Sequence, residues 1–413
     1  MALKEVKVLL ANLKPGMYVS RLDRPWKDAP YPLQGFLINS QEDIDKLLEY
    51  CNCVIVDVAR SSSPKDQKSK PAPLVDKKKD MAIKQGLIKM KPKRYKDTAS
   101  RKDELIVAEK SYRVLSEVTS EILNNVVNNK NLDMPQLKKA VNPMIDSVLR
   151  NPDAYAWLTR LKHADHYTYN HSICCAVWAV AFGRHLGMPR KDLQSLALGA
   201  LLFDVGKMKL PEKLINNPKR FNNTEFKIVQ QHVEYSLDIL KETADVNDDV
   251  FNMVRMHHER HNGSGYPEGL KGDQISIYGK IAGLVDCYDA MISDRVFASA
   301  LSPHDAVKKF YEWRNIDFQS ELVEQFIQIV GIYPVGTLVE LSSGVVGVIV
   351  NQHRIWRLRP QIMLLLNKNK EPLAEFETID LFIQTVDEDG ESLDIVKSVE
   401  PGMYGIDPDE FYI

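Results

Sequence analysis

The sequence lacks the features that mark membrane proteins, secreted proteins and proteins that bind polyanions. Its most apolar run, Ile173–Phe182, is only about half of the ~20 residues that a membrane-spanning helix needs, so we expect no membrane insertion. The N-terminus holds no long apolar segment of the kind found in secretory signals. With 54 lysines and arginines against 56 aspartates and glutamates, the net charge of -2 predicts no general attraction to DNA, RNA or anionic membrane surfaces.

Cysteine is also scarce, and its spacing argues against a disulfide framework. The five cysteines form no Cys-x-x-Cys pair and no regular series; they are Cys51, Cys53, Cys174, Cys175 and Cys287. Thiols in this arrangement are typical of a reducing compartment, so the sequence predicts a cytoplasmic protein.

The length and the residue pattern of the sequence predict its domain organisation. A chain of 413 residues is long enough for two or three domains, because one domain usually takes about 100–200 residues. The pattern predicts a mainly α protein with a small α+β domain in front and a short β-rich extension behind. The predicted segments are the α+β domain at 1–60, a basic linker at 61–97, a helical connector at 98–150, a helical domain at 151–330 and the extension at 331–413.

Stretches rich in valine and isoleucine predict strands at both ends of the chain. At the front these stretches are Glu5–Leu13 and Cys53–Ala59, and a helix is expected at Glu42–Tyr50 between them. At the back, Thr337–Asn351 predicts a hairpin with Ser-Gly at its turn, and Gln361–Lys368 predicts a further strand.

The composition changes between the front domain and the helices. Residues 61–97 hold 11 lysines and 1 arginine against 4 aspartates, together with four prolines, which is typical of a solvated linker. In the helix that follows, apolar residues recur at spacings of three and four, at Leu105, Ala108, Tyr112, Leu115, Val118, Ile122 and Val126. This face either packs into the core or forms a dimer contact.

Residues 132–330 are predicted to be helical almost throughout, and the candidate chemistry lies there. Asp192 is expected to cap one helix, and either Asn223 or Thr224 to cap another. Nine of the ten histidines fall between His163 and His304. The most informative acidic and histidine residues lie on or at the ends of predicted helices; they are His171, Asp204, His232, His257, His258 and Asp286. Side chains from separate helices can converge in a bundle, and imidazole with carboxylate suits Fe, Mn, Co or Zn.

Two features of spacing sharpen this hypothesis. Asp204 and Lys207 are three residues apart and therefore share a helix face. A carboxylate that bridges metal ions beside an ammonium group that meets phosphate is suited to phosphodiester hydrolysis. Asp204 and Asp286 also sit among apolar residues, where a carboxylate is costly unless it is paired or bound to metal. Cys175 lies one turn after His171, and packing is favoured over metal binding there.

The stretch from His257 to Asp273, HHERHNGSGYPEGLKGD, predicts an unusual loop. Its four glycines, Gly263, Gly265, Gly269 and Gly272, fall within ten residues and indicate unusual backbone angles or a close approach to a ligand. Tyr266 in this loop is placed to stack on a nucleobase.

The order of these motifs resembles that of the HD-GYP phosphodiesterases, bacterial enzymes that hydrolyse cyclic dinucleotides, chiefly cyclic di-GMP. The matching stretches are YTYNHS, LLFDVGK, QHVEYS, HHERHNGSGYPEGLKGD and LVDCYDAMISDR, within roughly residues 158–310. The front domain is similar to a small domain of unknown function that often precedes HD-GYP modules. The resemblance implies an HD-type helical bundle and a role in bacterial second-messenger signalling.

The resemblance also implies roles for individual residues. Two divalent transition metal ions, with iron, manganese or cobalt expected, would be bound by His171, Asp204, His232, His257, His258 and Asp286. Asp204 would bridge them, and Lys207 would contact the substrate phosphate or assist the leaving group. Tyr266 and Arg295 would lie near the substrate, where an arginine suits a phosphate or the Hoogsteen edge of guanine.

Three positions depart from the family pattern. Phe203 stands where the HD pair has histidine, and Asn262 stands where aspartate is usual. The segment after Arg295, RVFASALSP, lacks a basic residue often found there, with Ala298 in it. Because the other six ligand positions and Lys207 are intact, an active site for two metals is favoured over a decayed one, with water or a substrate oxygen filling the vacant position.

Three functions remain open at this point. The first is metal-dependent hydrolysis of cyclic di-GMP, or of cyclic GMP-AMP, to the linear dinucleotide or to GMP. The second is a catalytically impaired module that binds a cyclic dinucleotide or a partner protein, because Phe203 replaces the HD histidine. The third is another HD-type nucleotide phosphohydrolase, which the GYP segment argues against. A homodimer or a signalling partner is compatible with each of them.

Overall fold

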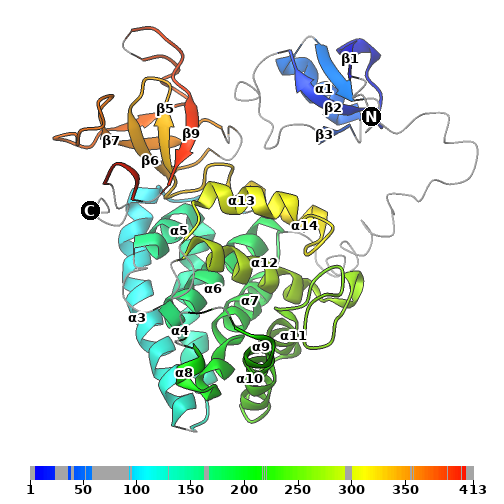
Figure 1. The fold of residues 1–413 in the computed structure, drawn as a ribbon, viewed down its shortest axis with the longest axis vertical. Helices are drawn as coiled ribbons and strands as arrows, with labels where there is room; N and C mark the ends of the chain where they lie inside the picture. The colour runs from blue at the N-terminus through cyan, green and yellow to red at the C-terminus, as the bar shows by residue number, and fades with distance from the viewer. Residues whose placement is uncertain are drawn as a thin grey trace, which may run out of the picture.

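The computed structural model describes most of the chain (Figure 1). The described residues are 5–23, 36–38, 41–51, 53–57, 93, 95–128, 130–161, 167–215, 217, 219, 221–293, 300–353, 356, 358–387, 389–400 and 402–405. Arg295, Ala298 and almost all of the predicted linker therefore lie outside the described residues. The predicted domain boundaries stay a prediction.

The front of the chain forms a four-stranded antiparallel sheet with one helix. The elements are β1 (Glu5–Leu9), η1 (Leu10–Asn12), β2 (Tyr18–Leu22), β3 (Phe36–Leu37), α1 (Gln41–Tyr50) and β4 (Cys53–Asp57), and the strand order is β1-β4-β2-β3. Ile44 and Leu47 of α1 pack on Val19, Val54 and Val56 of the sheet. The α+β prediction for this segment is confirmed, although the first predicted strand turns into a 3-10 turn after Leu9.

The centre of the chain is a body of packed helices, drawn in cyan to yellow in Figure 1. Its helices are α3 (Arg101–Val127), α4 (Met134–Arg150), α5 (Pro152–Leu161), α6 (Tyr167–His185), α7 (Arg190–Leu202), α8 (Glu212–Ile215), α9 (Asn223–Gln230), α10 (His232–Lys241), α11 (Asp248–Met256), α12 (Ile277–Ile292), α13 (Pro303–Glu312) and α14 (Ser320–Val330). Two 3-10 turns, η4 (Val205–Lys209) and η5 (Gly272–Gln274), interrupt the sequence of helices. The mainly α fold class is confirmed.

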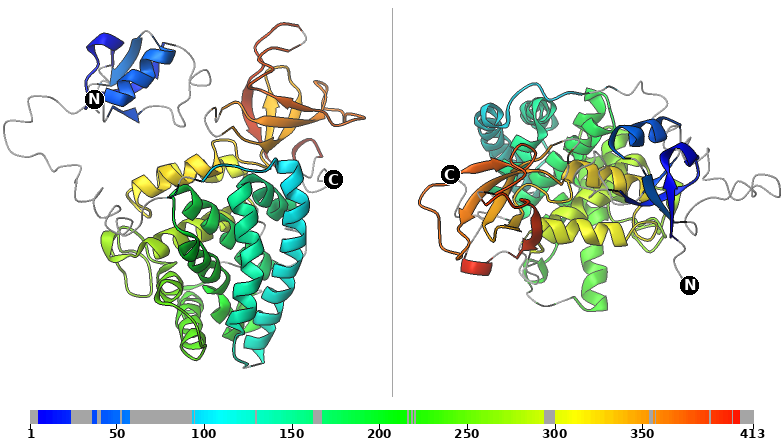
Figure 2. Two further views of the ribbon diagram at one scale, coloured as in Figure 1. Left: turned by 180° about the vertical axis from the view of Figure 1, so that it is seen from behind. Right: turned by 90° about the horizontal axis from the view of Figure 1, so that it is seen from above.

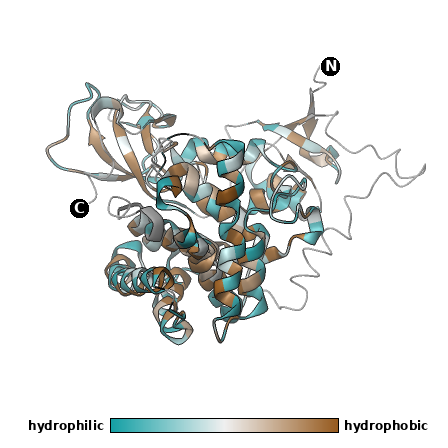
Figure 3. Cartoon of the chain, turned by 60° about the horizontal axis from the view of Figure 1, so that its bottom comes forward, coloured by the Kyte–Doolittle hydropathy of each residue, from teal (hydrophilic) through white to brown (hydrophobic). Residues whose placement is uncertain are grey.

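Helix α6 lies in the interior because it is apolar on nearly all sides. Every described residue from Asn170 to Ala181 is buried, and α6 packs against α7 and α12. The predicted apolar face of α3 is also buried, with Ala108 and Leu115 fully covered. That face therefore packs inside the chain. In Figure 3 most of these helices carry both hydrophobic and hydrophilic residues.

The back of the chain forms a second antiparallel sheet, seen from two sides in Figure 2. Its strands are β5 (Leu338–Leu341), β6 (Val346–Asn351), β7 (Gln361–Leu366), β8 (Thr378–Asp380) and β9 (Ile395–Val399), in the order β8-β7-β6-β5-β9. The predicted hairpin pairs β5 with β6. Trp157 of α5 packs into the apolar cluster of Leu338 and Val348, so this sheet shares a core with the helical body.

Two predicted helix caps were wrong by a few residues. Helix α7 begins after Pro189, and Asp192 lies inside its first turn. Asn222 caps α9 and forms a capping box with Glu225, because the backbone N–H groups at the helix start need an acceptor in the preceding extended residue. Within the described ranges, no helix combines the length and the apolar character that crossing a bilayer demands.

Candidate functional site

The six predicted metal ligands converge inside the helical body. His171 lies on α6, Asp204 directly after α7, His232 at the start of α10, and the His257–His258 pair directly after α11. Asp286 lies on α12, which packs against α6 and α11. Residues separated by up to 115 positions therefore meet in one place. Their side-chain donor atoms form two groups: cluster A is Asp204, His232, His257 and His258, and cluster B is His171, Asp204 and Asp286.

Cluster A places three imidazoles around one carboxylate oxygen. Asp204 Oδ1 lies 3.3 Å from His232 Nε2 and 3.7 Å from His257 Nε2. The two Nε2 atoms are 3.3 Å apart, and His258 packs edge-on to His232 with ring centroids 5.0 Å apart. All four residues are buried except His258, which is partly exposed.

Cluster B uses the other oxygen of the same aspartate. Asp204 Oδ2 lies 3.6 Å from His171 Nε2, which is itself 3.2 Å from Asp286 Oδ1. The second oxygen of Asp286 lies 3.8 Å from His258 Nδ1 and links the two clusters. Asp204 is thus shared between them, one carboxylate oxygen on each side.

Hydrogen bonds hold the imidazoles with one nitrogen facing the clusters. His232 Nδ1 donates to the Val229 carbonyl and His257 Nδ1 to the Val254 carbonyl, each at 2.6 Å. These bonds place the proton on Nδ1 and leave the Nε2 lone pair facing Asp204, which is the orientation that metal-binding histidines take. His171 Nδ1 lies 2.6 Å from Asp289 Oδ2 and turns its Nε2 toward Asp286 in the same way.

This donor set fits divalent transition metal ions. Ligand atoms about 2.0–2.2 Å from one ion lie roughly 3.0–3.5 Å apart, close to the 3.2–3.7 Å separations within the two clusters. Asp204 Oδ1 is buried and accepts no hydrogen bond from any residue that the structure describes. A buried carboxylate oxygen in that position is costly unless a cation compensates it.

The charges of the clusters shift the pKa values of their members in opposite directions. Burial lowers the pKa of His171, but its hydrogen bonds to Asp286 and Asp289 outweigh burial and raise that pKa to about 9. Burial lowers the pKa of His232 to about 4, against the attraction of Asp204. Burial opposes ionisation of Asp204, yet Lys207 and the imidazoles hold the pKa of this carboxyl well below its usual range.

These two histidines predict a stability maximum near pH 6.5 for the chain stripped of metal. His171 has a raised folded-state pKa, so its contribution is present below pH 6.5 and is lost as pH rises toward 9. The folded-state pKa of His232 is lowered, so the unfolded chain binds more protons than the folded chain. Stability therefore falls as the pH is lowered from 6.5 to 4. Each slope is at most about 1.4 kcal/mol per pH unit.

Urea unfolding in a chelator at pH 4.5, 6.5 and 8.5 measures both slopes. His232→Asn is expected to reduce the dependence of stability on pH only below pH 6.5, where the lowered pKa of His258 still contributes. His171→Asn is expected to reduce it only above pH 6.5, so each variant controls for the other. Identical midpoints at the three pH values for the unmodified chain would contradict the expectation.

Lys207 lies on the 3-10 turn that follows α7, not on the helix itself. The helix ends at Leu202, and Asp204 and Lys207 keep their shared face across the turn, with Lys207 Nζ 2.6 Å from Asp204 Oδ2. This turn is clamped to α10 by Ser236, whose hydroxyl accepts from Gly206 N–H and donates to the Phe203 carbonyl. A Cβ on Gly206 would lie 2.2 Å from the carbonyl oxygen of His232, so only glycine fits there.

Phe203 occupies the interior between the two clusters. Its side chain is fully buried, stacks on His257 with ring centroids 4.8 Å apart, and meets His171 edge-on at 6.0 Å. The ring fills space and offers no donor atom, so the structure leaves cluster B with three donor residues. Asn262, the second departure, keeps a local bond: its side-chain oxygen accepts from Ser264 N–H at 2.8 Å.

The glycine-rich loop brings Tyr266 to the edge of cluster A. Its ring stacks on His258 with centroids 4.5 Å apart and meets Phe226 edge-on at 5.9 Å. Burial raises the pKa of Tyr266, so the phenol stays neutral. A Cβ on Gly265 would come within 2.5 Å of the His258 carbonyl oxygen, which explains the glycine beside the tyrosine.

Sequence reasoning missed several residues around the site. Asp289 orients His171 and stands three residues after Asp286, a helical spacing that could have revealed it. Ser236 and Glu259 act through hydrogen bonds to backbone groups distant in sequence, for which no local pattern exists. Cys175, in contrast, was considered from the sequence, with packing favoured over metal binding. Its sulfur lies 3.7–3.8 Å from the two ring nitrogens of His171 and 3.7 Å from the Val285 carbonyl, and the residue is fully buried.

Comparison with known proteins gives the helical body a family. A protein-family model described as "HD domain" matches residues 143–318 of the chain. This region of the chain is therefore similar to HD domains. A second model, "Domain of unknown function (DUF3391)", matches residues 5–137. The resemblance to HD-GYP proteins, with a domain of unknown function in front, is therefore confirmed, and the HD domain carries all six predicted ligands.

Curated relatives match both regions. The chain is 29% identical over 378 residues to a Pseudomonas aeruginosa protein named cyclic di-GMP phosphodiesterase PA4108. The alignment covers 91% of this chain and 88% of that protein. It is 32% identical over 135 residues to 3'3'-cGAMP-specific phosphodiesterase 3 of Vibrio cholerae, covering 33% of this chain and 29% of that one. A solved structure described as Bd1817, an HDG"Y"P protein from Bdellovibrio bacteriovorus, aligns with 16% identity over 79% of this chain and 99% of that chain, with a TM-score of 0.47.

Proposed function

We propose that the HD domain is a metal-dependent phosphodiesterase that hydrolyses a cyclic dinucleotide, cyclic di-GMP or 3'3'-cGAMP, to the linear dinucleotide or to GMP. The observation that carries this proposal is the position of Asp204, whose two oxygens face two clusters of donors while Lys207 contacts the same carboxylate. The names of the curated relatives support the substrate class. A location in a bacterial cytoplasm belongs to this proposal, because the five cysteines form no Cys-x-x-Cys pair and no regular series.

The donor atoms suggest how two divalent ions would be held. Cluster A would bind one ion through three imidazoles and Asp204 Oδ1; cluster B would bind the other through His171, Asp286 and Asp204 Oδ2. When bound, such ions lower the pKa of a water molecule and neutralise the oxygens of a phosphodiester. Iron, manganese and cobalt suit this mixture of imidazole and carboxylate.

The remaining residues would act on the substrate. Lys207 Nζ, on a side chain that is 30% exposed, would neutralise negative charge that grows on the phosphoryl group as the water oxygen bonds to phosphorus and the ribose oxygen leaves. Tyr266 would offer its ring to a nucleobase beside cluster A. Arg295, which lies outside the described residues, is proposed to contact a phosphate or a guanine edge.

Turnover with product analysis tests the function. Metal-depleted protein is reloaded with Fe(II), Mn(II) or Co(II), incubated with cyclic di-GMP or 3'3'-cGAMP, and the products are separated by chromatography. Cleavage of either substrate supports the proposal. Metal-loaded protein that leaves both intact would refute it, and tight binding without a product would favour the alternative of a receptor without turnover, which Phe203 motivates.

Phe203 predicts that cluster B binds its ion more weakly than cluster A. Phe203→His adds an imidazole between His171 and His257, and we expect the weaker of two ions to bind about 10-fold tighter or more. Competition titration with a chelator indicator measures this without any assay of turnover. Phe203→Leu, which also removes the aromatic ring but adds no donor, is the control; equal gains in both variants would contradict the ligand explanation.

A further inference from the structure

Glu259 is a buried carboxylate next to the predicted ligand His258. The residue is 4% exposed, and its side chain accepts three hydrogen bonds from consecutive backbone N–H groups of the glycine-rich loop. Oε1 accepts from Glu268 N–H at 2.8 Å and from Gly269 N–H at 3.1 Å, and Oε2 accepts from Leu270 N–H at 2.8 Å. Bonds from backbone donors to an ionised acceptor are among the stronger hydrogen bonds in proteins.

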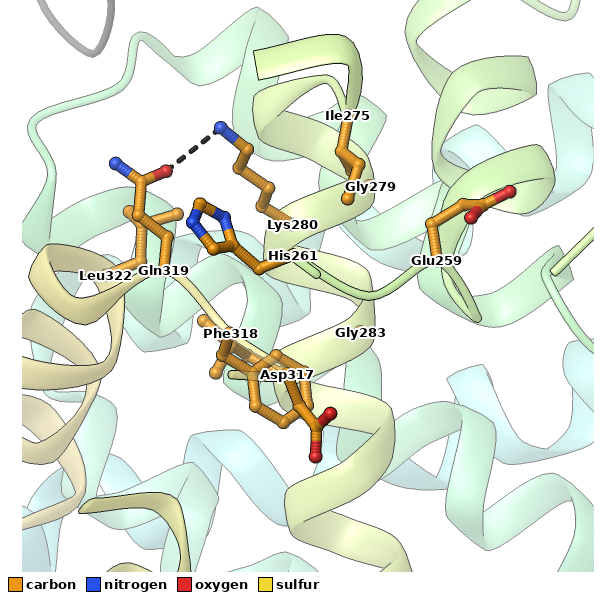
Figure 4. Close-up of a pocket in the computed structure, with 11 residues that line it drawn as sticks. Glu259, His261, Ile275, Gly279, Lys280, Gly283, Asp317, Phe318, Gln319 and Leu322 are labelled. Atoms are coloured by element: carbon orange, nitrogen blue, oxygen red, sulfur yellow. Dashed lines mark hydrogen bonds between the residues drawn. The ribbon is translucent and has the colours of Figure 1, made fainter. Parts of the chain in front are cut away.

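No ion pair of Glu259 occurs within 4 Å among the residues that the structure describes, so the loop amides compensate its charge. Lys280 lines the same small cavity of about 10 Å³, but its ammonium group donates to Gln319 at 2.9 Å and lies 3.5 Å from Asp273. In Figure 4 the carboxylate of Glu259 points away from Lys280. Losing the amide partners would leave a buried charge without compensation, which is strongly unfavourable.

The segment held by these bonds begins two residues after Tyr266. The Tyr266 N–H donates to the His258 carbonyl at 3.2 Å, and the tyrosine ring stacks on the His258 imidazole. The loop is therefore attached to the residues after α11 on both sides of Tyr266: at the His258 carbonyl before the ring and at Glu259 after it. An ion pair between Arg255 and Glu268 adds a contact at the exposed surface.

We propose that Glu259 is a positioning residue that holds Tyr266 in its place beside cluster A and so sets the affinity for the nucleotide. This inference rests on the proposed function. The carboxylate would touch neither the metal ions nor the substrate; it couples the backbone that carries the two histidines to the backbone that carries the stacking ring. A loop displaced by even about 1 Å can cost a factor of about 100 in a substrate-dependent step.

Glu259→Gln tests the inference because it keeps the shape and turns one acceptor oxygen into a donor that faces backbone N–H groups. We expect amide hydrogen exchange to accelerate at least about 10-fold at residues 268–270, where direct bonds to Glu259 now protect the amides. We expect KM to rise about 10- to 100-fold, while the bound metal content and kcat at saturation stay within about twofold.

Glu268→Gln is the matched control, since it neutralises an exposed carboxylate of the same loop whose partner is the Arg255 side chain and not the loop backbone. It is expected to leave exchange at Gly269 and Leu270 and KM unchanged. If Glu259→Gln does not fold, Glu259→Asp keeps the charge and shortens the reach by one methylene group, with the same expected changes.

The outcomes separate this inference from the proposed function. Unchanged exchange at residues 268–270, or faster exchange with an unchanged KM, overturns the positioning role of Glu259. A fall in metal content that accounts for the loss of activity also overturns it, because the residue would then support the histidines alone. If the unmodified protein binds but does not cleave cyclic di-GMP, hydrolysis fails as the function. The Kd from calorimetry then replaces KM: a weaker Kd in Glu259→Gln supports the positioning role, and an unchanged Kd overturns it.

Discussion

Replacing Asp204 with asparagine is expected to lower kcat by about 10⁴-fold or more, because one side chain serves both clusters. The amide keeps the shape of the carboxylate but removes its charge, and only one of its two terminal atoms can bind a metal ion. The variant should therefore lose metal from both clusters, and metal analysis should show a lower content alongside the lost turnover.

The chain offers a closely matched control for this substitution. Asp238 on α10 pairs with Lys241 three residues later, the same spacing as Asp204 and Lys207, but both members are exposed. Asp238→Asn is expected to leave turnover and metal content unchanged. Substantial turnover by the Asp204 variant, with unchanged metal content, would remove the basis for a shared carboxylate.

Lys207→Met is expected to lower kcat about 10²- to 10³-fold while metal binding is retained or strengthened. Methionine keeps much of the length of the side chain but removes the charge that would meet the phosphoryl group. Because Lys207 also holds the pKa of Asp204 low by its positive charge, its loss leaves a more basic carboxylate and removes a cation next to the metal sites. A loss of turnover without a loss of metal is therefore specific to a role on the substrate.

Lys241→Met provides the comparison on the exposed pair, with no change in kcat expected. Equal kcat for Lys207→Met and the unmodified chain, with full metal occupancy in both, would exclude a catalytic role for Lys207. A fall in metal content in the Lys207 variant would instead assign this residue to support of the Asp204 turn.

The fold could be predicted in outline because its strongest signals are local. The apolar period of α3 and the valine-rich strands β4 and β6 depend on neighbours in the sequence, and each formed where predicted. The ends of the helices were predicted less well. Asp192, the predicted cap of α7, lies inside the helix, and Asn222 caps α9 in place of its predicted neighbours. A helix begins after the residue that stays extended, and packing helps to decide which residue that is.

The site divides in the same way. Residue types and spacing predicted the six ligands, Lys207 and Tyr266 as site residues. The structure brings these eight residues together. Spacing gave no sign of Ser236 or Glu259, because their partners are backbone groups whose positions depend on how a turn or loop lies against a helix.

What the sequence determined by itself is the chemistry available: imidazoles and carboxylates on separate helices, an ammonium group three residues from one carboxylate, and a phenylalanine directly before that carboxylate. What only the tertiary structure decided is how these groups are shared. The assignment of one oxygen of Asp204 to each cluster, and the parallel stacking of Phe203 on His257, arise where α6, α7, α10, α11 and α12 pack together. Such geometry depends on contacts between residues far apart in the chain, which no local pattern encodes.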